Sequence, residues 1–203
     1  MLGTVLGLGL ASAVLAPIAL PAGAANGARV TNSQFGFSLV LPAGWNQISL
    51  DPTHLGDVLG PHAKVSSSLH QTLTTEAATE ASKGVAVFAF LNKRDKDGFF
   101  PNLRVSPQKG FLATISQLEG GLRAGLARAG ATSTSVKVVR YPSGRAVVGT
   151  YAQGNPNKPA DKVWGVQIYV VHGSNLLVLT LASTNRTQVD QAGTTVSSTL
   201  RFT

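Results

Sequence analysis

The chain has 203 residues, a formal net charge of +8 at neutral pH and no cysteine. The absence of cysteine excludes disulfides, thiolate nucleophiles, zinc–thiolate sites and lipid attachment to an N-terminal cysteine. The length is close to that of one domain, and the basic balance favours anionic partners over cationic ones.

The N-terminal segment is apolar and carries no charge before Arg29. It ends in small residues, with Ala22 and Ala24 forming an A-x-A pattern that is typical of signal-peptide cleavage. We therefore predict a signal peptide over residues 1–24, cleaved between Ala24 and Ala25. A membrane-anchoring helix is the alternative interpretation, because about 20 apolar residues can span a bilayer.

The rest of the chain is interpreted as a short linker over residues 25–34 and a single domain over residues 35–203. Alternation of side chains at 37–41 predicts a first strand, which the Pro-Ala-Gly turn at 42–44 ends. Asp51 followed by proline is typical of a helix start, and it predicts a short helix through residue 59.

A second helical segment is expected from Pro61 to Gly84, with apolar residues at i+4 spacing. Residues 84–91 are apolar on both faces, which predicts a central strand covered on two sides. Residues 99–105 are interpreted as a short edge strand.

The clearest amphipathic helix covers residues 111–129, because its apolar residues recur every three or four positions. Gly120 and Gly121 interrupt it at a cost of about 1 kcal/mol each, so close packing against a neighbouring element is expected there. The apolar stripe consists of Phe111, Ile115, Leu118, Leu122, Leu126 and Ala129.

Four strands are then predicted over residues 135–140, 146–153, 163–172 and 175–182, and a final helix over 188–199. Their short connections require antiparallel neighbours. The sequence therefore predicts an α+β fold in which an antiparallel meander carries helices on both of its faces.

Few residues suggest catalysis or metal binding. Ser143 lies in a Tyr-Pro-Ser-Gly segment that is interpreted as a hairpin turn, and Asp95 begins an Asp-Lys-Asp-Gly turn that lacks the later ligands of a calcium loop. His54, His62 and His70 belong to the first helical region, but no carboxylate at suitable spacing completes a metal site. We predict no catalytic residue, no metal and no cofactor.

Two aromatic residues, Trp164 and Tyr169, are separated by an odd number of positions on one predicted strand. Side chains alternate across a strand, so these two point to opposite faces. At most one of them can contribute to a given binding cleft, whose ligand-binding residues stay unknown from the sequence.

The order of elements resembles a known family. A strand followed by Pro-Ala-Gly-Trp at 42–45, a Gly-Arg-Ala-Val-Val-Gly-Thr-Tyr strand at 144–151 and a Leu-Val-Leu-Thr-Leu-Ala strand at 177–182 are similar to LpqN/LpqT-type envelope proteins of actinobacteria. That family shares the fold of the photosystem subunit PsbP and of the Ran-binding protein Mog. The resemblance covers about residues 32–203 and implies an α/β/α sandwich without established catalytic residues.

Three functional hypotheses follow. The leading one is a non-enzymatic protein, secreted or held in the cell envelope as a monomer, that binds a protein partner or an amphiphilic ligand and can contact the membrane peripherally. The second is a hydrolase or transferase with unrecognised residues. The third is a structural, antigen-like secreted protein without a dedicated ligand. Nucleic acid is not expected as a partner, because the basic residues lack interleaved aromatic side chains and match no nucleic-acid-binding motif.

Overall fold

The computed structural model describes residues 27–59, 65–91, 93, 95, 98–155 and 158–203. The predicted signal peptide and its cleavage site at Ala24 and Ala25 lie outside these residues. The described elements, in chain order, are β1 (Arg29–Asn32), β2 (Phe37–Val40), β3 (Trp45–Ile48), β4 (Val58–Leu59), α1 (Ser67–Ser82), β5 (Val87–Leu91), β6 (Asn102–Gln108), α2 (Ile115–Arg128), β7 (Thr132–Tyr141), β8 (Gly144–Asn155), β9 (Lys158–His172), β10 (Asn175–Ser183), α3 (Arg186–Thr199) and β11 (Arg201–Phe202).

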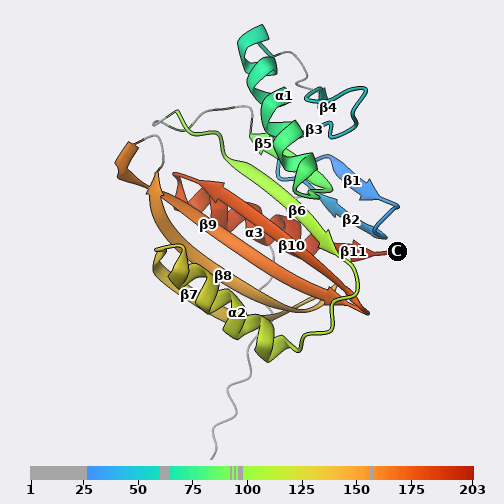
Figure 1. Ribbon diagram of the computed structural model, residues 1–203, viewed down its shortest axis with the longest axis vertical. Coiled ribbons are helices and arrows are strands. Elements are labelled where there is room, and N and C mark those ends of the chain that lie inside the picture. Colours follow the sequence, from blue (N-terminus) through green and yellow to red (C-terminus); the bar gives the residue numbers. More distant parts are fainter. Residues whose placement is uncertain (1–26, 60–64, 92, 94, 96–97, 156–157) are drawn as a thin grey trace, which may run out of the picture.

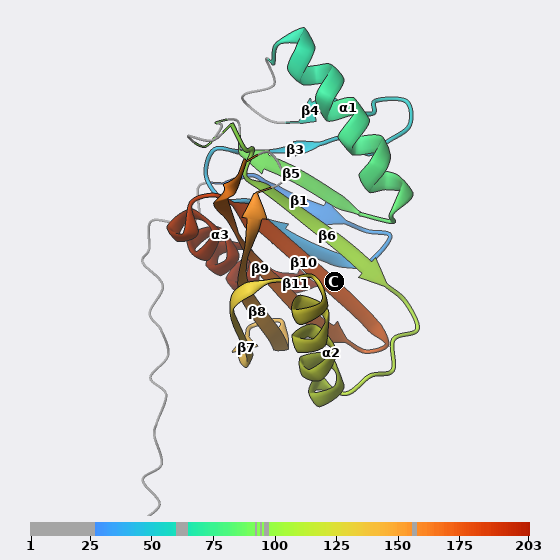
Figure 2. The same ribbon diagram turned by 60° about the vertical axis from the view of Figure 1, so that its left-hand side comes forward.

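The strands form two antiparallel sheets. The main sheet has eight strands in the order β4-β3-β5-β6-β10-β9-β8-β7, and a small sheet has the order β1-β2-β11. Helices α1 and α2 lie on one face of the main sheet, while α3 and the small sheet lie on the other (Figures 1 and 2). The predicted α+β class with helices on both faces is confirmed.

The largest core lies between the main sheet, α3 and the small sheet. Strand β5 is buried on both faces, as predicted, with Val87 and Ala89 in this core and Phe88 and Phe90 on the opposite side under α1. A third cluster lies under α2. Trp45 is 6% exposed within the largest core.

Helix α2 begins at the N-cap Thr114, whose hydroxyl accepts from the backbone of Gln117 while the Gln117 side chain accepts from the backbone of Thr114. The predicted helix is confirmed over residues 115–128, where Leu118, Leu122 and Leu126 are buried against β7 and β8. The predicted bounds of 111–129 are too long, because Phe111 lies before the helix, where its N–H donates to the Ser174 carbonyl, and Ala129 is exposed at the C-cap. The packing expected at the helix glycines is wrong: no heavy atom of another element lies within 4 Å of a Cβ placed at Gly120 or Gly121.

Three other predictions need correction. Residues 51–57 form turns instead of a helix, because Gly56 adopts a φ of +85° and its N–H donates to the Ser49 carbonyl. Strand β6 is central instead of an edge strand, since it pairs with both β5 and β10. The predicted linker at 25–34 contains β1, which pairs with β2.

The C-terminal half agrees closely with its prediction. The hairpin between β7 and β8 closes at Tyr141 and Gly144, and β9 and β10 pair in the expected antiparallel register. Helix α3 buries Val189, Ala192 and Val196. In the described part of the chain, no helix combines the length and apolar character needed to cross a membrane.

Candidate binding face

One face of the main sheet is only partly covered by helices. Eight strands spaced about 4.8 Å apart give a sheet about 34 Å wide. Two helices of about 10 Å each cover about 20 Å of this width. Because α1 lies over the β3–β5 end and α2 over the β7–β8 end, the middle strands β6, β10 and β9 are only partly covered on this side (Figures 1 and 2). The covered part is near the β9–β10 hairpin, where Leu176 is buried in the cluster under α2. We call this region the open face.

The floor of the open face is made of side chains that the strand register places side by side. Residues between them in sequence, such as Val105 and Leu179, point into the core on the α3 side. The floor residues themselves are partly exposed. In the strand order β6, β10, β9, they form the rows Arg104–Thr180–Gln167 and Ser106–Val178–Tyr169.

An ionic cluster occupies the α1 end of the open face. Glu80 is 2% exposed, with Arg104 Nε 2.8 Å from its Oε2 and Lys83 Nζ 3.2 Å from its Oε1. Arg104 also donates from Nη1 to Asn102 Oδ1 at 2.8 Å, and its guanidinium lies 5.7 Å from the centre of the Phe88 ring. Two cations share one carboxylate, so the cluster carries one net positive charge.

Sequence reasoning missed this cluster, although a signal was present. Glu80 follows Leu73 and Ala77 at spacings of four and three, which places the carboxylate on the buried stripe of α1. A buried carboxylate requires a cation to compensate its lost hydration. Its partner Arg104 comes from β6, and the side chain of Arg104 is 30% exposed. The side chain of Arg104 is therefore partly accessible, although its Nε atom is buried.

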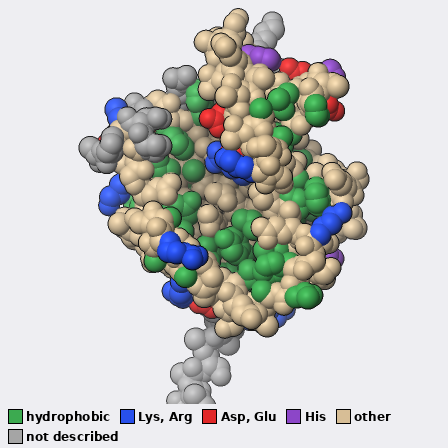
Figure 3. Space-filling view, viewed as in Figure 1, with side chains coloured by type: hydrophobic (Ala, Val, Ile, Leu, Met, Phe, Trp, Pro, Cys, Tyr) green, Lys and Arg blue, Asp and Glu red, His purple; other side chains and the backbone are tan. Residues whose placement is uncertain are grey.

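An apolar patch occupies the α2 end of the same face. Figure 3 shows hydrophobic side chains gathered there, between the two helices and over the sheet. Leu112, in the segment leading into α2, is 89% exposed. The patch also contains partly buried residues that pack against the cluster under α2, namely Phe111, Ile115, Tyr169, Val171 and Val178.

Two tyrosines, Tyr151 on β8 and Tyr169 on β9, belong to the cluster under α2. Burial raises the pKa of both Tyr151 and Tyr169 above the ordinary value of 10.0. Both phenols are therefore neutral at physiological pH and do not offset the charge of Arg104. The Tyr151 ring lies across Gly165, the residue opposite it on β9.

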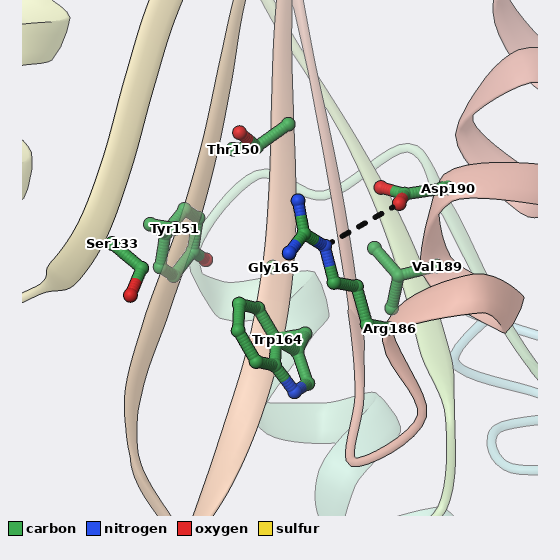
Figure 4. A pocket seen from close by; sticks show the side chains of 8 residues that line it. All are labelled: Ser133, Thr150, Tyr151, Trp164, Gly165, Arg186, Val189 and Asp190. Atoms are coloured by element: carbon green, nitrogen blue, oxygen red, sulfur yellow. Dashed lines mark ion pairs between the residues drawn. The ribbon is translucent and has the colours of Figure 1, made fainter.

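A small pocket lies where β7, β8, β9 and α3 meet (Figure 4). Its volume of about 10 Å³ is enough for about one water molecule and too small for an organic ligand. The Arg186 guanidinium lies 5.0 Å from the Trp164 ring centre, and Arg186 Nε lies 3.7 Å from Asp190 Oδ2. The pocket is lined by Ser133, Thr150, Tyr151, Trp164, Gly165, Arg186, Val189 and Asp190.

Trp164 and Tyr169 lie on opposite faces of β9, as predicted, because Trp164 packs against the largest core and Tyr169 against the cluster under α2. Only Tyr169 therefore belongs to the open face. Trp164 belongs to the small pocket on the α3 side.

Two of the histidines named from the sequence, His54 and His70, lie in the β3–β4 loop and on α1. His54 Nδ1 is 3.4 Å from Asp57 Oδ2, and His70 Nε2 is 3.2 Å from Asp57 Oδ1. His62 lies outside the described residues. Across the part of the chain that the structure describes, no three His, Cys, Asp or Glu side chains are grouped so that they could hold a metal ion.

Asp95 has a structural contact that the sequence did not indicate. Its Oδ2 accepts hydrogen bonds from the Ser183 hydroxyl, the Thr184 backbone and the Thr184 hydroxyl at 2.8–2.9 Å. These bonds attach the segment after β5 to the junction between β10 and α3. Ser143 occupies the turn between β7 and β8, as predicted.

The solved structures that are similar to this chain include CyanoP and LpqN. The solution structure of cyanobacterial PsbP (CyanoP) from Synechocystis sp. PCC 6803 has a TM-score of 0.49 and 14% identity, covering 97% of this chain and 99% of that one. The crystal structure of LpqN, described as involved in cell envelope biogenesis of Mycobacterium tuberculosis, has a TM-score of 0.48 and 10% identity, covering 88% of this chain and 86% of that one. No family model and no curated protein matches.

Proposed function

We propose that this protein is an exported, non-catalytic binding protein of the cell envelope or the extracellular space. Its ligand is an anionic amphiphile held on the open face. The observation that carries the proposal is the juxtaposition of a net positive ionic cluster and an apolar patch on one uncovered sheet surface. The anionic head lies against Arg104, and the apolar chain lies over Val178 and Tyr169.

The dimensions of the open face suit this ligand. Gln167, in the row of Arg104, and Val171, in the apolar patch, are four residues apart on β9, which corresponds to about 13 Å. A short amphiphile spans this distance. The floor is a hydrogen-bonded sheet and therefore needs no rearrangement before binding, which favours affinity.

The chemistry of the floor supports binding without catalysis. Its two rows contain one arginine, two hydroxyl residues, one amide, one neutral phenol and one valine. The nearest carboxylate, Glu80, is already paired with two cations. Neither row contains a histidine or carboxylate that could act as a general base.

Titration calorimetry with two probes of equal chain length tests the proposal. Dodecyl phosphate carries an anionic head and dodecyl maltoside a neutral one, and both are used below their micelle-forming concentrations. We expect tighter binding of dodecyl phosphate, with an affinity that falls between low and physiological salt because screening weakens the charge contact. Native mass spectrometry of the exported protein should show a retained acidic amphiphile.

Two pairs of variants locate the site. Val178→Asp places a carboxylate on the floor and should reduce binding at least tenfold, whereas Val138→Asp, on strand β7, should not. Lys83→Gln should weaken the binding of dodecyl phosphate several-fold. Its control is Lys158→Gln, because Lys83 and Lys158 are similarly exposed, at 61% and 58%, and each pairs with a carboxylate.

Arg104 needs a paired substitution, because removing one partner of a buried ion pair leaves the other uncompensated. Glu80→Gln combined with Arg104→Gln removes both charges. The double variant should fold and lose the preference for the phosphate head, while it keeps affinity for the maltoside.

Equal affinity for both probes, or binding that Val178→Asp leaves unchanged, would refute the proposal that the open face binds an anionic amphiphile. Absence of any amphiphile, together with capture of one defined protein that Val178→Asp abolishes, would favour a protein partner on the same face. Reproducible hydrolysis of an ester, glycoside or peptide substrate would refute the non-catalytic assignment.

A further inference from the structure

Strand β7 forms one outer edge of the main sheet, and no other strand among the described residues pairs with its outer side. The strand runs from Thr132 to Tyr141 and pairs only with β8 in the described sheet. Its register is regular from Ser135 to Tyr141, after an irregularity that includes Ser133 at a φ of +52°. The regular part of this edge strand is therefore seven residues long, and alternate residues in it direct backbone groups away from β8.

The direction of the free backbone groups follows from one hydrogen bond. The Val136 carbonyl accepts from Arg123 Nη2 of α2 at 2.7 Å, so this carbonyl points away from β8. In an antiparallel strand, alternate residues direct both backbone groups to the same side. Val138 and Arg140 therefore also direct their N–H and C=O groups outward, while Lys137 and Val139 direct theirs to β8.

The charge around this edge is strongly positive. Lys137 and Arg140 lie on β7, and Arg145 is directly opposite Arg140 on β8. Strand β7 contains no acidic residue. On α2, Arg123 is 56% exposed, and Glu119 lies 2.8 Å from it.

The same charges disfavour a second copy of this chain. Two β7 edges paired with each other would bring basic side chains of both copies together, and lysine on an edge strand is a known protection against self-pairing. A negatively charged strand has the opposite balance, because its side chains would lie beside Lys137 and Arg140 while its backbone pairs with the outward groups.

We propose that the β7 edge binds an extended acidic segment of another protein by strand addition. The segment forms hydrogen bonds with the outward N–H and C=O groups of Val138 and Arg140. Its acidic side chains lie beside Arg140 on one face of the sheet and beside Lys137 on the other. Backbone pairing provides affinity, and charge selects the partner. This surface is separate from the open face and does not depend on the amphiphile proposal.

A labelled peptide of alternating valine and glutamate residues is the probe, with an alternating valine and lysine peptide as its control. Fluorescence anisotropy should show binding of the acidic peptide only, weakening as salt increases. In an ¹H–¹⁵N spectrum, the acidic peptide should shift the amides of Val138 and Arg140 and protect them from hydrogen exchange.

Val138→Pro removes one outward N–H while leaving the pairing with β8 intact, since proline is tolerated where an edge N–H faces solvent. It should reduce peptide binding at least tenfold, whereas Val138→Ala retains the N–H and should bind within about twofold of the native chain. Val178→Asp should bind the peptide normally.

If Val138→Pro does not fold, a peptide N-methylated at its central residues tests the same strand pairing on the native protein. It lacks the N–H groups that would donate to the outward carbonyls of β7, and it should bind at least tenfold more weakly. The proposal fails if the acidic peptide does not bind at millimolar concentration, if its N-methylated form binds equally, or if the shifted amides lie outside β7. Dimerisation of the free protein that protects the same amides would overturn it in favour of a second copy.

Discussion

Substitution of Gly165 by alanine tests the close packing of the Tyr151 ring of β8 against Gly165 of β9. A Cβ at this position would lie 2.2 Å from Tyr151 Cζ, 2.5 Å from its hydroxyl and 2.6 Å from Cε1. Carbon atoms in contact are about 3.5–4.0 Å apart, so the ring must move by roughly 1 Å or more to admit one methyl group. Tyr151 is 7% exposed and has little room for this movement.

Overpacking of this kind costs about 1–3 kcal/mol. For a domain of this size, each kcal/mol lowers the melting temperature by about 2–4 °C. We therefore expect Gly165→Ala to lower it by about 2–12 °C, measured by differential scanning calorimetry. The backbone is not the cause, because Gly165 does not adopt a positive φ.

A double-mutant cycle separates the clash from other effects. In a Tyr151→Ala background the ring is absent, so Gly165→Ala should add little, and the coupling should be about 1–3 kcal/mol. Gly120→Ala is the control, since this helical glycine faces open space and its replacement should stabilise the protein by about 0.4–1 kcal/mol. If the effects of the two substitutions on the free energy of unfolding were additive, the proposed clash between Cβ and the Tyr151 ring would be refuted.

Three further predictions use simpler measurements. Leu122→Ala should lower the free energy of unfolding by about 2–5 kcal/mol in urea, while Leu112→Ala, at a position that is 89% exposed, should change it by less than about 0.5 kcal/mol. Because burial raises the pKa of Tyr151 and Tyr169, the native state holds these protons more tightly than the unfolded state. The contribution of these two phenols to stability should therefore be constant below pH 10.0 and fall as the pH rises above it, and Phe at both positions should weaken that fall. N-terminal sequencing of the exported protein should begin at Ala25, and an intact N-terminus found only in membranes would indicate an anchor.

Local patterns predicted much of this fold because local interactions determine those elements. Leu118, Leu122 and Leu126 repeat at helical spacing, and α2 forms around them. The hairpins joining β7 to β8 and β9 to β10 close through short turns, which fix an antiparallel register without distant contacts. The predicted side-chain alternation along β9 was correct for the same reason.

Pairings between distant segments could not be predicted in this way. The sequence predicts a short edge strand at residues 99–105, yet β6 pairs with β10, which follows it only after α2 and three strands. The ionic cluster could not be predicted for the same reason, since Glu80 and Arg104 belong to different elements that meet only in the folded chain. The Asp-Pro pair at residues 51–52 shows the opposite error: a good helix start formed only a turn, because Gly56 adopts a positive φ and its N–H donates to the Ser49 carbonyl.

The two proposed surfaces can be distinguished because different chemical groups face them. On the open face the backbone is already paired on both sides of β10, so recognition there depends on the side chains of Arg104, Val178 and Tyr169. At the β7 edge the outward backbone groups of Val138 and Arg140 are the main contacts. Val178→Asp should therefore abolish amphiphile binding and spare the peptide, and Val138→Pro should do the reverse. A variant that lost both activities together would show that the two surfaces are coupled through the sheet, because Val178 and Val138 lie on strands separated by β9 and β8.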